Sequence, residues 1–287
     1  MMSKVAKTVR AAVKRVIPEQ IIAARAAVNG YRDKLGTRPN LLFPSKFTEK
    51  VQWRKVFVRD KRLPLLADKV LVKDFVKDRI GAEHVIPTLW HGEVLPPRHQ
   101  RAWPIPFVVK ANHGCGFNAF VRSPAECDWD RIEQTTAAWL ETKYGEWGGE
   151  WMYSVIKRQL LVEPFVGKDS CFPFDYKVWV FNGVAHFVQV DTDRETLHKR
   201  AMFDRDWVRL NFQVTHPLSE RRIERPVSLD EILKFSEMLA SGFDFVRVDF
   251  YEIDGVPKFG EMTFYPEAGY GRFLPNDMDV KVGSLWH

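Results

Sequence analysis

Hydrophobic and charged residues alternate regularly near the C-terminal end of the chain. Apolar Val246 and Val248 alternate with charged Arg247 and Asp249. Alternation of this kind predicts a strand that turns one face toward a hydrophobic core and presents its charges on the other. A second strand-like run follows after an Asp-Gly pair, which is typical of a tight turn. The two runs together predict an antiparallel hairpin.

The same kind of pattern divides the rest of the chain into short strands and capped helices. Asn182-Gly183 separates two apolar runs and predicts a further hairpin, while Asn29-Gly30 predicts the end of a helix. The predicted strands cover residues 85–89, 107–111, 119–122, 160–163, 175–181, 184–191, 245–252 and 256–263. The predicted helices cover residues 19–29, 70–80, 128–144 and 229–240. Antiparallel hairpins with helices between them indicate the α+β class.

The first segment, residues 1–17, combines an apolar stripe with a basic surface. Val5, Val9 and Val13 fall on one face at helical spacing, and lysines and arginines surround the rest. Such a helix is suited to an anionic membrane surface, where its valines would enter the lipid boundary. A terminal helix docked on the domain explains the same pattern, so both interpretations stay open.

The composition is that of a folded protein with free thiols. The chain has 287 residues, 45% of them hydrophobic, which is enough for one large core or two lobes that share a cleft. Cys115, Cys127 and Cys171 show neither paired nor metal-ligand spacing, which favours a reducing cytoplasm. No apolar run reaches the roughly 20 residues that span a bilayer. The net charge of +6 suits phosphates or anionic lipid, and the basic residues form no single stripe that would indicate nucleic acid.

Candidate chemistry begins at a lysine beside a glycine-containing loop. Lys110 ends an apolar strand directly before residues 112–118, whose two glycines let the backbone approach a ligand closely. Phosphoryl transfer needs cations against the polyphosphate and carboxylates to hold Mg2+. The polar face of the final hairpin offers Arg247 and Asp249. Each feature alone is also typical of a solvated strand, and the loop lacks the pattern G-x-x-x-x-G-K-[ST], so the interpretation depends on their order along the chain.

Taken in their order along the chain, these sequence motifs resemble the ATP-grasp superfamily. They resemble its TupA-like family more closely, which is named for teichuronopeptide biosynthesis. The resemblance runs over residues 53–273. The motifs that carry it are Asp68-Lys69, residues 110–118, Val162-Glu163, Asp175-Tyr176-Lys177, Phe181-Asn182-Gly183, Gln189-Val190-Asp191 and residues 245–249. The implied fold has two α+β lobes that sandwich ATP, with extra N-terminal helices. The expected divisions are an N-terminal helical segment (1–50), an N-terminal subdomain (51–105), a small lobe (106–163) and a large lobe (164–287).

The resemblance also implies roles for individual residues. The implied nucleotide contacts are Lys69, Lys110, His113, Gly114, Cys115, Gly116 and Glu163, with the backbone of Phe165 and Val166 against the adenine. The implied catalytic residues are Lys177, Arg200 and Arg247. Cys115 stands where relatives usually carry serine. The loop around it would close over the phosphates with backbone N–H groups.

Asp249 and Glu261 are the implied Mg2+ ligands, with Thr263 standing where many ATP-grasp enzymes have an asparagine ligand. Two carboxylates of a hairpin can share one metal only from the same face, because side chains alternate faces along a strand. With a two-residue turn, Glu261 would point away from Asp249. We therefore expect a bulged three-residue turn at residues 253–255, which places Glu261 opposite Arg247 and brings the two carboxylates within roughly 5 Å of each other.

Superfamily chemistry implies a carboxylate–amine ligase that uses ATP and Mg2+ and proceeds through an acyl phosphate. The implied setting is surface polysaccharide synthesis in the cytoplasm or at the inner face of the membrane, with a uronic acid or amino acid as the carboxylate. Two alternatives stay open. A glycan kinase would use the same ATP site with Asp191 or His198 as general base. A glycosyltransferase would use the D-x-D sequence Asp191-Thr192-Asp193 to hold a metal against a sugar nucleotide.

Overall fold

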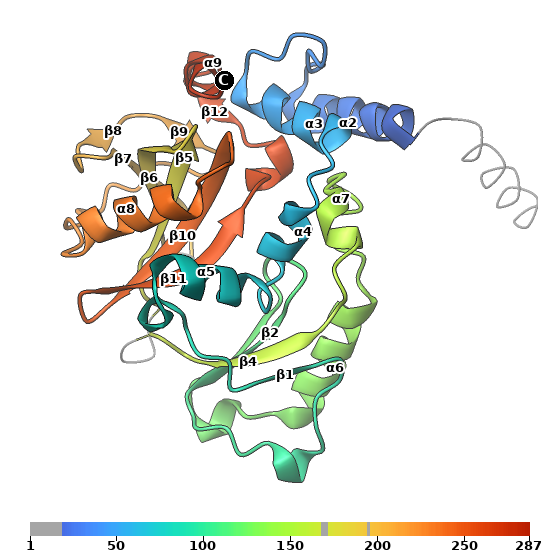
Figure 1. Ribbon diagram of the computed structural model, residues 1–287, viewed down its shortest axis with the longest axis vertical. Helices are drawn as coiled ribbons and strands as arrows, with labels where there is room; N and C mark the ends of the chain where they lie inside the picture. Colours follow the sequence, from blue (N-terminus) through green and yellow to red (C-terminus); the bar gives the residue numbers. More distant parts are fainter. Residues whose placement is uncertain (1–18, 168–171, 194–195) are drawn as a thin grey trace, which may run out of the picture.

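The structure is a computed structural model that describes residues 19–167, 172–193 and 196–287 (Figure 1). Cys171 and the basic segment of residues 1–17 lie outside the described residues, so the predictions made for them stay predictions. Within the described ranges the strands form sheets of four, six and two strands. The four-stranded and six-stranded sheets lie at different ends of the molecule, with helices between and around them. The predicted α+β class is confirmed.

The four-stranded sheet is built on the strand that ends near Lys110. Its order is β1-β4-β2-β3, and all neighbours are antiparallel. The strands are β1 (Trp90–Gly92), β2 (Phe107–Ala111), β3 (Asn118–Val121) and β4 (Leu160–Pro164). The predicted strand at residues 85–89 is wrong, because Val85 makes only an isolated bridge with Phe259 and the first strand begins at Trp90.

The six-stranded sheet contains both predicted hairpins, in the order β11-β10-β5-β6-β7-β8. Its strands are β5 (Asp175–Phe181), β6 (Val184–Thr192), β7 (Lys199–Asp204), β8 (Arg209–Leu210), β10 (Phe245–Ile253) and β11 (Val256–Thr263). Asn182 and Gly183 form the predicted two-residue turn between β5 and β6, both at positive φ. Two short strands, β9 (Gln213–Val214) and β12 (Phe273–Leu274), form the remaining sheet.

One face of the six-stranded sheet is apolar at one end and charged at the other. At the apolar end the ring of Phe47 packs against Trp179 and Phe245 with centroid distances of 5.0 and 4.9 Å. Further along the same strands the same face carries Lys177 and Asp249, which pair across β5 and β10. The sheet therefore anchors itself in the core at one end and presents charges to a cavity at the other.

The turn of the last hairpin differs from the predicted one. Asp254 and Gly255 both have positive φ angles, 51° and 77°, and Ile253 pairs with Val256. These are the features of a two-residue turn whose twist matches the flanking strands. The predicted three-residue turn is therefore wrong.

The extra residue that brings Glu261 to the face of Asp249 is Gly260, which lies in the strand and not in the turn. The register shifts by one residue next to Asp249, which pairs directly with Glu261, and Gly260 is left as the extra residue of a β-bulge. A one-residue bulge inverts the parity of the strand beyond it, so Glu261 returns to the face of Asp249. The predicted shared face is confirmed, but the predicted pairing of Glu261 with Arg247 is wrong.

Helices connect the sheets and cover them. The described helices are α2 (Glu19–Leu35), α3 (Phe47–Phe57), α4 (Arg62–Ala67), α5 (Val72–Ile80), α6 (Trp129–Glu141), α7 (Trp151–Ser154), α8 (Leu229–Leu239) and α9 (Asp277–Ser284). Helix α2 continues past Gly30, where the ring of Tyr270 lies against it, so the predicted stop at Asn29-Gly30 is wrong. Among the described helices, none has the length and apolar character needed to cross a membrane.

Candidate functional site

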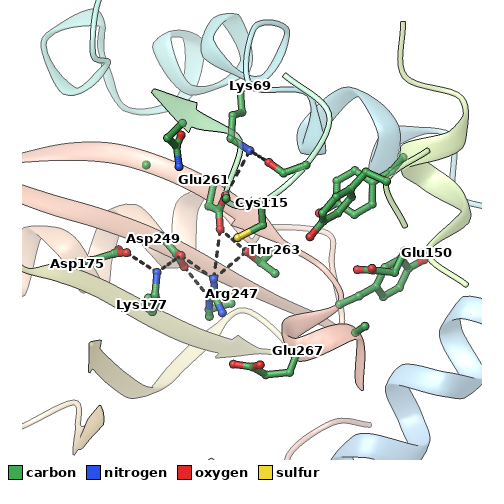
Figure 2. A pocket seen from close by; sticks show the side chains of 18 of the residues that line it. Lys69, Cys115, Glu150, Asp175, Lys177, Arg247, Asp249, Glu261, Thr263 and Glu267 are labelled. Carbon is green, nitrogen blue, oxygen red and sulfur yellow. Dashed lines mark hydrogen bonds and ion pairs between the residues drawn. The ribbon is translucent and has the colours of Figure 1, made fainter. Parts of the chain in front are cut away.

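A cavity of about 910 Å3 lies between the two larger sheets. The four-stranded sheet contributes Lys110 and Glu163 to its lining, and the six-stranded sheet contributes Lys177, Arg247 and Asp249. Figure 2 shows the side chains of the six-stranded sheet converging on one another within the cavity. The fold thus brings together predicted site residues from distant parts of the chain.

Sheet register explains why these side chains meet. Lys177 pairs with Asp249, and Asp249 pairs with Glu261, so the three form a row across β5, β10 and β11. Arg247 and Thr263 form the neighbouring pair, two residues along on the same face. Directly opposed residues in an antiparallel sheet have Cβ atoms about 5 Å apart. The row is therefore a direct consequence of hairpin pairing and of the bulge.

Asp249 lies at the centre of the row and is only 2% exposed. Arg247 donates from Nε to Oδ1 and from Nη2 to Oδ2, each over 2.7 Å. Lys177 donates from Nζ to Oδ2 over 2.7 Å and also pairs with Asp175, a cavity residue that the sequence analysis did not assign. Two cations therefore compensate the buried carboxylate, as a buried charge requires.

Glu261 is partly exposed to the cavity. Its Oε1 accepts hydrogen bonds from Arg247 Nη2 at 3.3 Å and Thr263 Oγ1 at 3.2 Å, and its Oε2 lies 3.6 Å from Lys69 Nζ. Burial alone would raise the pKa of Glu261, but the charges of Lys69, Arg247 and Lys177 outweigh burial and hold the pKa at about 2. This carboxylate is therefore ionised at neutral pH and available to a cation.

Glu163 occupies the opposite wall, on β4, between two lysines. Lys110 Nζ donates to its Oε2 over 2.6 Å, and Lys73 forms an ion pair with its Oε1. Burial would raise the pKa of Glu163, but Lys110 and Lys73 outweigh it and hold the pKa below the ordinary value. Lys73 was not predicted. Lys69 precedes the first residue of α5, so helical spacing from Lys69 gives no signal for Lys73 in the sequence.

The glycine loop between β2 and β3 borders the cavity. Lys69 Nζ donates to the carbonyl oxygen of Gly114 over 2.6 Å. A side chain on Gly114 would lie 2.8 Å from the ring of Tyr144, and Gly116 has a φ of 79°, so both positions favour glycine for a physical reason. Cys115, which is exposed, lines the cavity between them.

Three residues predicted to contact the nucleotide lie outside the cavity lining. His113 is 1% exposed, and its Nε2 donates to the carbonyl of Trp139 over 3.2 Å, so it supports the loop from behind. The N–H of Phe165 donates to Pro106 over 3.0 Å and extends the β2–β4 ladder. Val166, the next residue in the chain, also lies outside the cavity lining. The predicted adenine contact of the backbone at Phe165 and Val166 stays a prediction.

Arg200 lies further along the six-stranded sheet and connects three segments. It donates to Asp191 Oδ1 over 2.7 Å, to the carbonyl of Val214 over 2.8 Å and to Glu267 Oε1 over 3.1 Å. His198 Nε2 lies 3.5 Å from Asp191 Oδ1. Burial would raise the pKa of Asp191, but the hydrogen bond with His198 and the charge of Arg200 hold it well below the usual range.

Glu150 and Glu267 also line the cavity and were not predicted. Glu150 lies just before α7, and Glu267 lies in the short η4 helix (Pro266–Gly269). Neither residue is part of a periodic pattern or of a motif that carries the family resemblance, so the sequence contains no signal for them. Their place in the cavity follows only from tertiary packing.

The donor set on the six-stranded sheet fits a magnesium ion that shares its coordination with phosphate. Asp249 and Glu261 provide carboxylate oxygens on one face, and the Thr263 hydroxyl lies beside them. Among the described residues, no group of three or more His, Cys, Asp or Glu side chains is arranged to hold a metal by itself. Mg2+ is commonly bound by one or two carboxylates plus substrate phosphates and water, so two carboxylates suffice here.

Comparisons with solved structures find ATP-grasp ligases. A D-alanine–D-alanine ligase from Bacillus anthracis aligns with a TM-score of 0.45 and 17% identity, over 76% of this chain and 63% of that one. An L-amino acid ligase from Bacillus licheniformis aligns with a TM-score of 0.43 and 13% identity, over 83% of this chain and 48% of that one. The chain thus spans less than two thirds of the length of either ligase. No curated protein matches the sequence.

The family comparison covers most of the chain. The profile described as "TupA-like ATPgrasp" matches residues 49–287. This range includes every residue of the row Lys177, Asp249 and Glu261, the glycine loop and the lysines of the opposite wall. It is also wider than the range over which the motifs alone suggested a resemblance. The chain belongs to the TupA-like ATP-grasp family.

Proposed function

We propose that the protein is an ATP- and Mg2+-dependent carboxylate–amine ligase that forms an amide through an acyl phosphate. The observation that carries the proposal is the row Lys177, Asp249 and Glu261 with Arg247 beside it. Oxygen ligands for a cation and cations for phosphate thus meet on one wall of the cavity. Family membership supports ATP as the phosphoryl donor.

The opposite wall supports a triphosphate bound between the sheets. Lys69, Lys73 and Lys110 line it, and the glycine loop lies beside them. Glu163 pairs with Lys73 and Lys110, so their ammonium groups are oriented before any ligand arrives. Phosphate oxygens accept the same charge-assisted hydrogen bonds as this carboxylate. ATP would therefore share or replace these contacts without creating a new cation site.

The residues of the six-stranded sheet account for the first of two chemical steps. In the first, a carboxylate oxygen of the substrate attacks the terminal phosphorus of ATP, and ADP leaves with the electron pair of the broken P–O bond. Arg247 and Lys177 neutralise the charge that develops on the transferred phosphoryl group. Mg2+ held by Asp249 and Glu261 would supply further charge neutralisation on the phosphates. In the second step an amine attacks the acyl carbon, the C–N bond forms, and inorganic phosphate leaves with the C–O electron pair.

The two alternatives receive less support. A kinase needs a base for its hydroxyl substrate, and the low pKa of Asp191 makes this carboxylate a poor proton acceptor. A glycosyltransferase that used Asp191-Thr192-Asp193 would need both carboxylates at one metal. Asp191 is instead engaged by Arg200, and Asp193 lies outside the residues that line the cavity.

We also propose a substrate class, a cellular location and a division of the chain into lobes. We propose a uronic acid or an amino acid as the carboxylate substrate, within surface polysaccharide synthesis at the cytoplasmic side of the membrane. The family resemblance supports this setting. The two sheets support a small lobe at residues 106–163 and a large lobe at residues 164–287. Residues 1–17 remain a proposed contact with an anionic membrane surface.

A hydroxylamine trap tests the reaction class. Purified protein is incubated with Mg-ATP, L-glutamate or D-glucuronate as the carboxylate, and hydroxylamine. We expect ADP and a hydroxamate to form only when all components are present, because hydroxylamine intercepts the acyl phosphate. Asp249→Asn should lower the rate by about 10²-fold or more, comparable with the loss of a group that stabilises charge in a transition state.

Lys281→Ala is the matched control for this experiment. Lys281 lies on α9 and pairs with Asp277 at the surface, outside the residues that line the cavity. The rate of hydroxamate formation by this variant should equal that of the wild type. Stable phosphate on the acceptor, with no hydroxamate, would identify a kinase and contradict the proposed function.

A further inference from the structure

One end of the cavity differs chemically from the rest. Around the row of Lys177 and Asp249 the lining is dominated by charged side chains, whereas near Glu150 it is dominated by aromatic rings. The aromatic residues of this end are Tyr144, Trp147, Tyr153, Tyr265 and Tyr270. Figure 2 shows Glu150 beside tyrosine rings, on the side of the cavity away from Asp175 and Lys177. We call this region the aromatic end.

Glu150 is a buried carboxylate that faces this end. It is 9% exposed and lines the cavity. Within the described part of the chain, no donor forms a hydrogen bond or a salt bridge with its side chain, and its charged neighbour is Lys55, which acts on it electrostatically. A buried carboxylate normally has such partners. Glu150 therefore retains the capacity to accept hydrogen bonds from a ligand.

Lys55 donates its hydrogen bonds to backbone carbonyls, so these bonds do not satisfy the carboxylate of Glu150. Its Nζ donates to the carbonyls of Gly148 over 2.5 Å and of Ala268 over 2.7 Å. It also lies 4.4 Å from the centroid of the Tyr270 ring. These contacts bind together the two sides of the aromatic end, one before α7 and one in η4, and hold Lys55 behind them.

The aromatic rings lie close enough to Glu150 to be affected by its charge. Burial raises the pKa of Tyr144 and of Tyr270, and the negative charge of Glu150 raises both further. The same two causes raise the pKa of Tyr153. The three tyrosines come from three segments, and the rings of Tyr144 and Tyr153 pack edge to face with centroids 4.9 Å apart. Aromatic faces around a carboxylate are the arrangement that recognises an organic ammonium group.

The backbone at this end is strained. Glu267 and Ala268 both have φ angles of 52°, a left-handed conformation that costs energy in residues other than glycine. Gln52 and Lys55 of α3 hold the turn by donating to the carbonyl of Ala268. Strain maintained by several buried contacts is characteristic of binding sites.

We propose that the aromatic end binds the amine substrate as a primary ammonium ion and that Glu150 accepts its proton. The inference rests on the proposed ligase function. Glu150 takes one proton from R–NH3+, and the nitrogen lone pair of R–NH2 attacks the acyl carbon. The C–N bond forms, the acyl C–O bond breaks, and the second proton passes from nitrogen to the departing phosphate. Protonated Glu150 then returns its proton to solvent.

The environment of Glu150 suits a general base. Burial raises the pKa of Glu150 to about 7, and Lys55 partly opposes this increase. Burial also lowers the pKa of Lys55 to about 7, so the two groups titrate in the same range. The other titratable groups that face Glu150 are Tyr144 from the loop before it, Tyr153 from α7, and Tyr265 and Tyr270 from around η4. All four are neutral at pH 7 because their pKa values lie above 10. A base with a pKa near the working pH combines the right protonation state with a useful driving force.

Glu150→Gln separates the two half-reactions. Each variant is assayed twice with Mg-ATP and L-glutamate or D-glucuronate, once with hydroxylamine and once with D-alanine as the amine. Hydroxylamine is a weakly basic amine that is largely unprotonated at neutral pH and needs no base. We expect Glu150→Gln to keep hydroxamate formation and to lose about 10²-fold or more in kcat/KM for D-alanine at pH 7. The wild-type kcat/KM for D-alanine should level off above pH 7, where Glu150 is ionised, whereas the value for the variant should keep rising as more of the amine loses its proton.

Glu146→Gln is the matched control, because Glu146 lies in the same loop, is exposed and does not line the cavity. It should behave as wild type in both assays. Trp147→Ala is a second variant that does not disturb the core, since Trp147 is 70% exposed at this end. It should raise KM for D-alanine and leave hydroxamate formation unchanged.

Each remaining outcome decides the question. Equal losses with hydroxylamine and D-alanine in Glu150→Gln would assign Glu150 to folding or to the ATP site and overturn the inference. Unchanged rates with both amines would overturn it as well. A wild-type protein that forms no hydroxamate would contradict the proposed function itself, and the inference with it.

Discussion

Glu163 shows how one residue orders a binding wall before any ligand is present. It is 4% exposed and lies between Lys73 and Lys110. Without the carboxylate, two partly buried ammonium groups would repel each other in a region of low dielectric constant. The ion pairs therefore stabilise the fold and keep both lysines directed toward the proposed phosphate site.

Glu163→Gln should destabilise the protein by about 3 kcal/mol at pH 7, the range for breaking a buried ion pair by removing one partner. The folded-state pKa of Glu163 is lowered, so its contribution is present above the unfolded pKa of about 4.3 and is lost as pH falls. The difference in unfolding free energy between wild type and variant should therefore shrink below about pH 4.3. Denaturant unfolding at a series of pH values measures it.

Glu93→Gln is the control for this prediction. Glu93 pairs with Lys157 at the surface, where both side chains are more than half exposed. Such a pair contributes about 0–1 kcal/mol. A Glu163→Gln penalty that stays constant down to pH 2 would show that shape, and not charge, accounts for the loss.

The last hairpin shows which part of an element can be predicted from sequence and which part cannot. Alternation over residues 245–252 correctly predicted the strand and its charged face. Asp254-Gly255 is a standard two-residue turn signal, and the structure contains that turn. A shared face for Asp249 and Glu261 requires one extra residue in the hairpin, and we predicted that residue in the turn. Gly260 is that residue instead, because a glycine within a strand favours a bulge as readily as a tight turn.

Helix α3 was not predicted at all, and its packing explains why. Its buried residues include Glu49, Gln52, Arg54 and Lys55, so its inward face does not appear hydrophobic in sequence. The polar side chains are paired inside the fold: Arg54 donates to the carbonyl of Phe245 over 2.8 Å. Periodicity cannot reveal a helix whose buried face is charged. For the same reason the sequence pattern did not reveal that Lys55 is buried.

Gly283 tests the contact between α9 and the start of α3. A Cβ atom on Gly283 would lie 2.2 Å from the carbonyl oxygen of Ser45 and 2.6 Å from the nitrogen of Phe47. In an isolated helix Gly→Ala stabilises by up to about 1 kcal/mol. Here we expect Gly283→Ala to destabilise by about 1–3 kcal/mol, because backbone atoms cannot move aside as a side chain can.

Thermal unfolding of Gly283→Ala should therefore show a lower Tm than the wild type. Ser284→Ala is the matched control, since Ser284 is exposed on the same helix and its hydroxyl donates to the local carbonyl of Lys281. A higher Tm for Gly283→Ala would mean that helix propensity decides at this position and that α9 does not pack closely on α3.

For the molecule as a whole, the sequence predicted the class of fold and most of the charged wall of the cavity. Lys177, Arg247 and Asp249 were assigned through an ordered set of motifs, and the structure brings them into contact. Glu150 and Lys73 were not assigned. Their positions depend on how two sheets and α3 pack together, which no local pattern records. Predictions were thus most successful where one hairpin determines the geometry.

The account of the whole molecule depends on one bond, the acyl–phosphate bond between a substrate carboxylate and the phosphoryl group of ATP. The protein is incubated with Mg-ATP, D-alanine and L-glutamate or D-glucuronate labelled with 18O in the carboxylate, and the inorganic phosphate is analysed by mass spectrometry. We predict that each phosphate released during amide formation carries one 18O atom from the carboxylate, because the acyl C–O bond breaks on the carbon side. Turnover of ATP that yields phosphate without 18O would contradict the account.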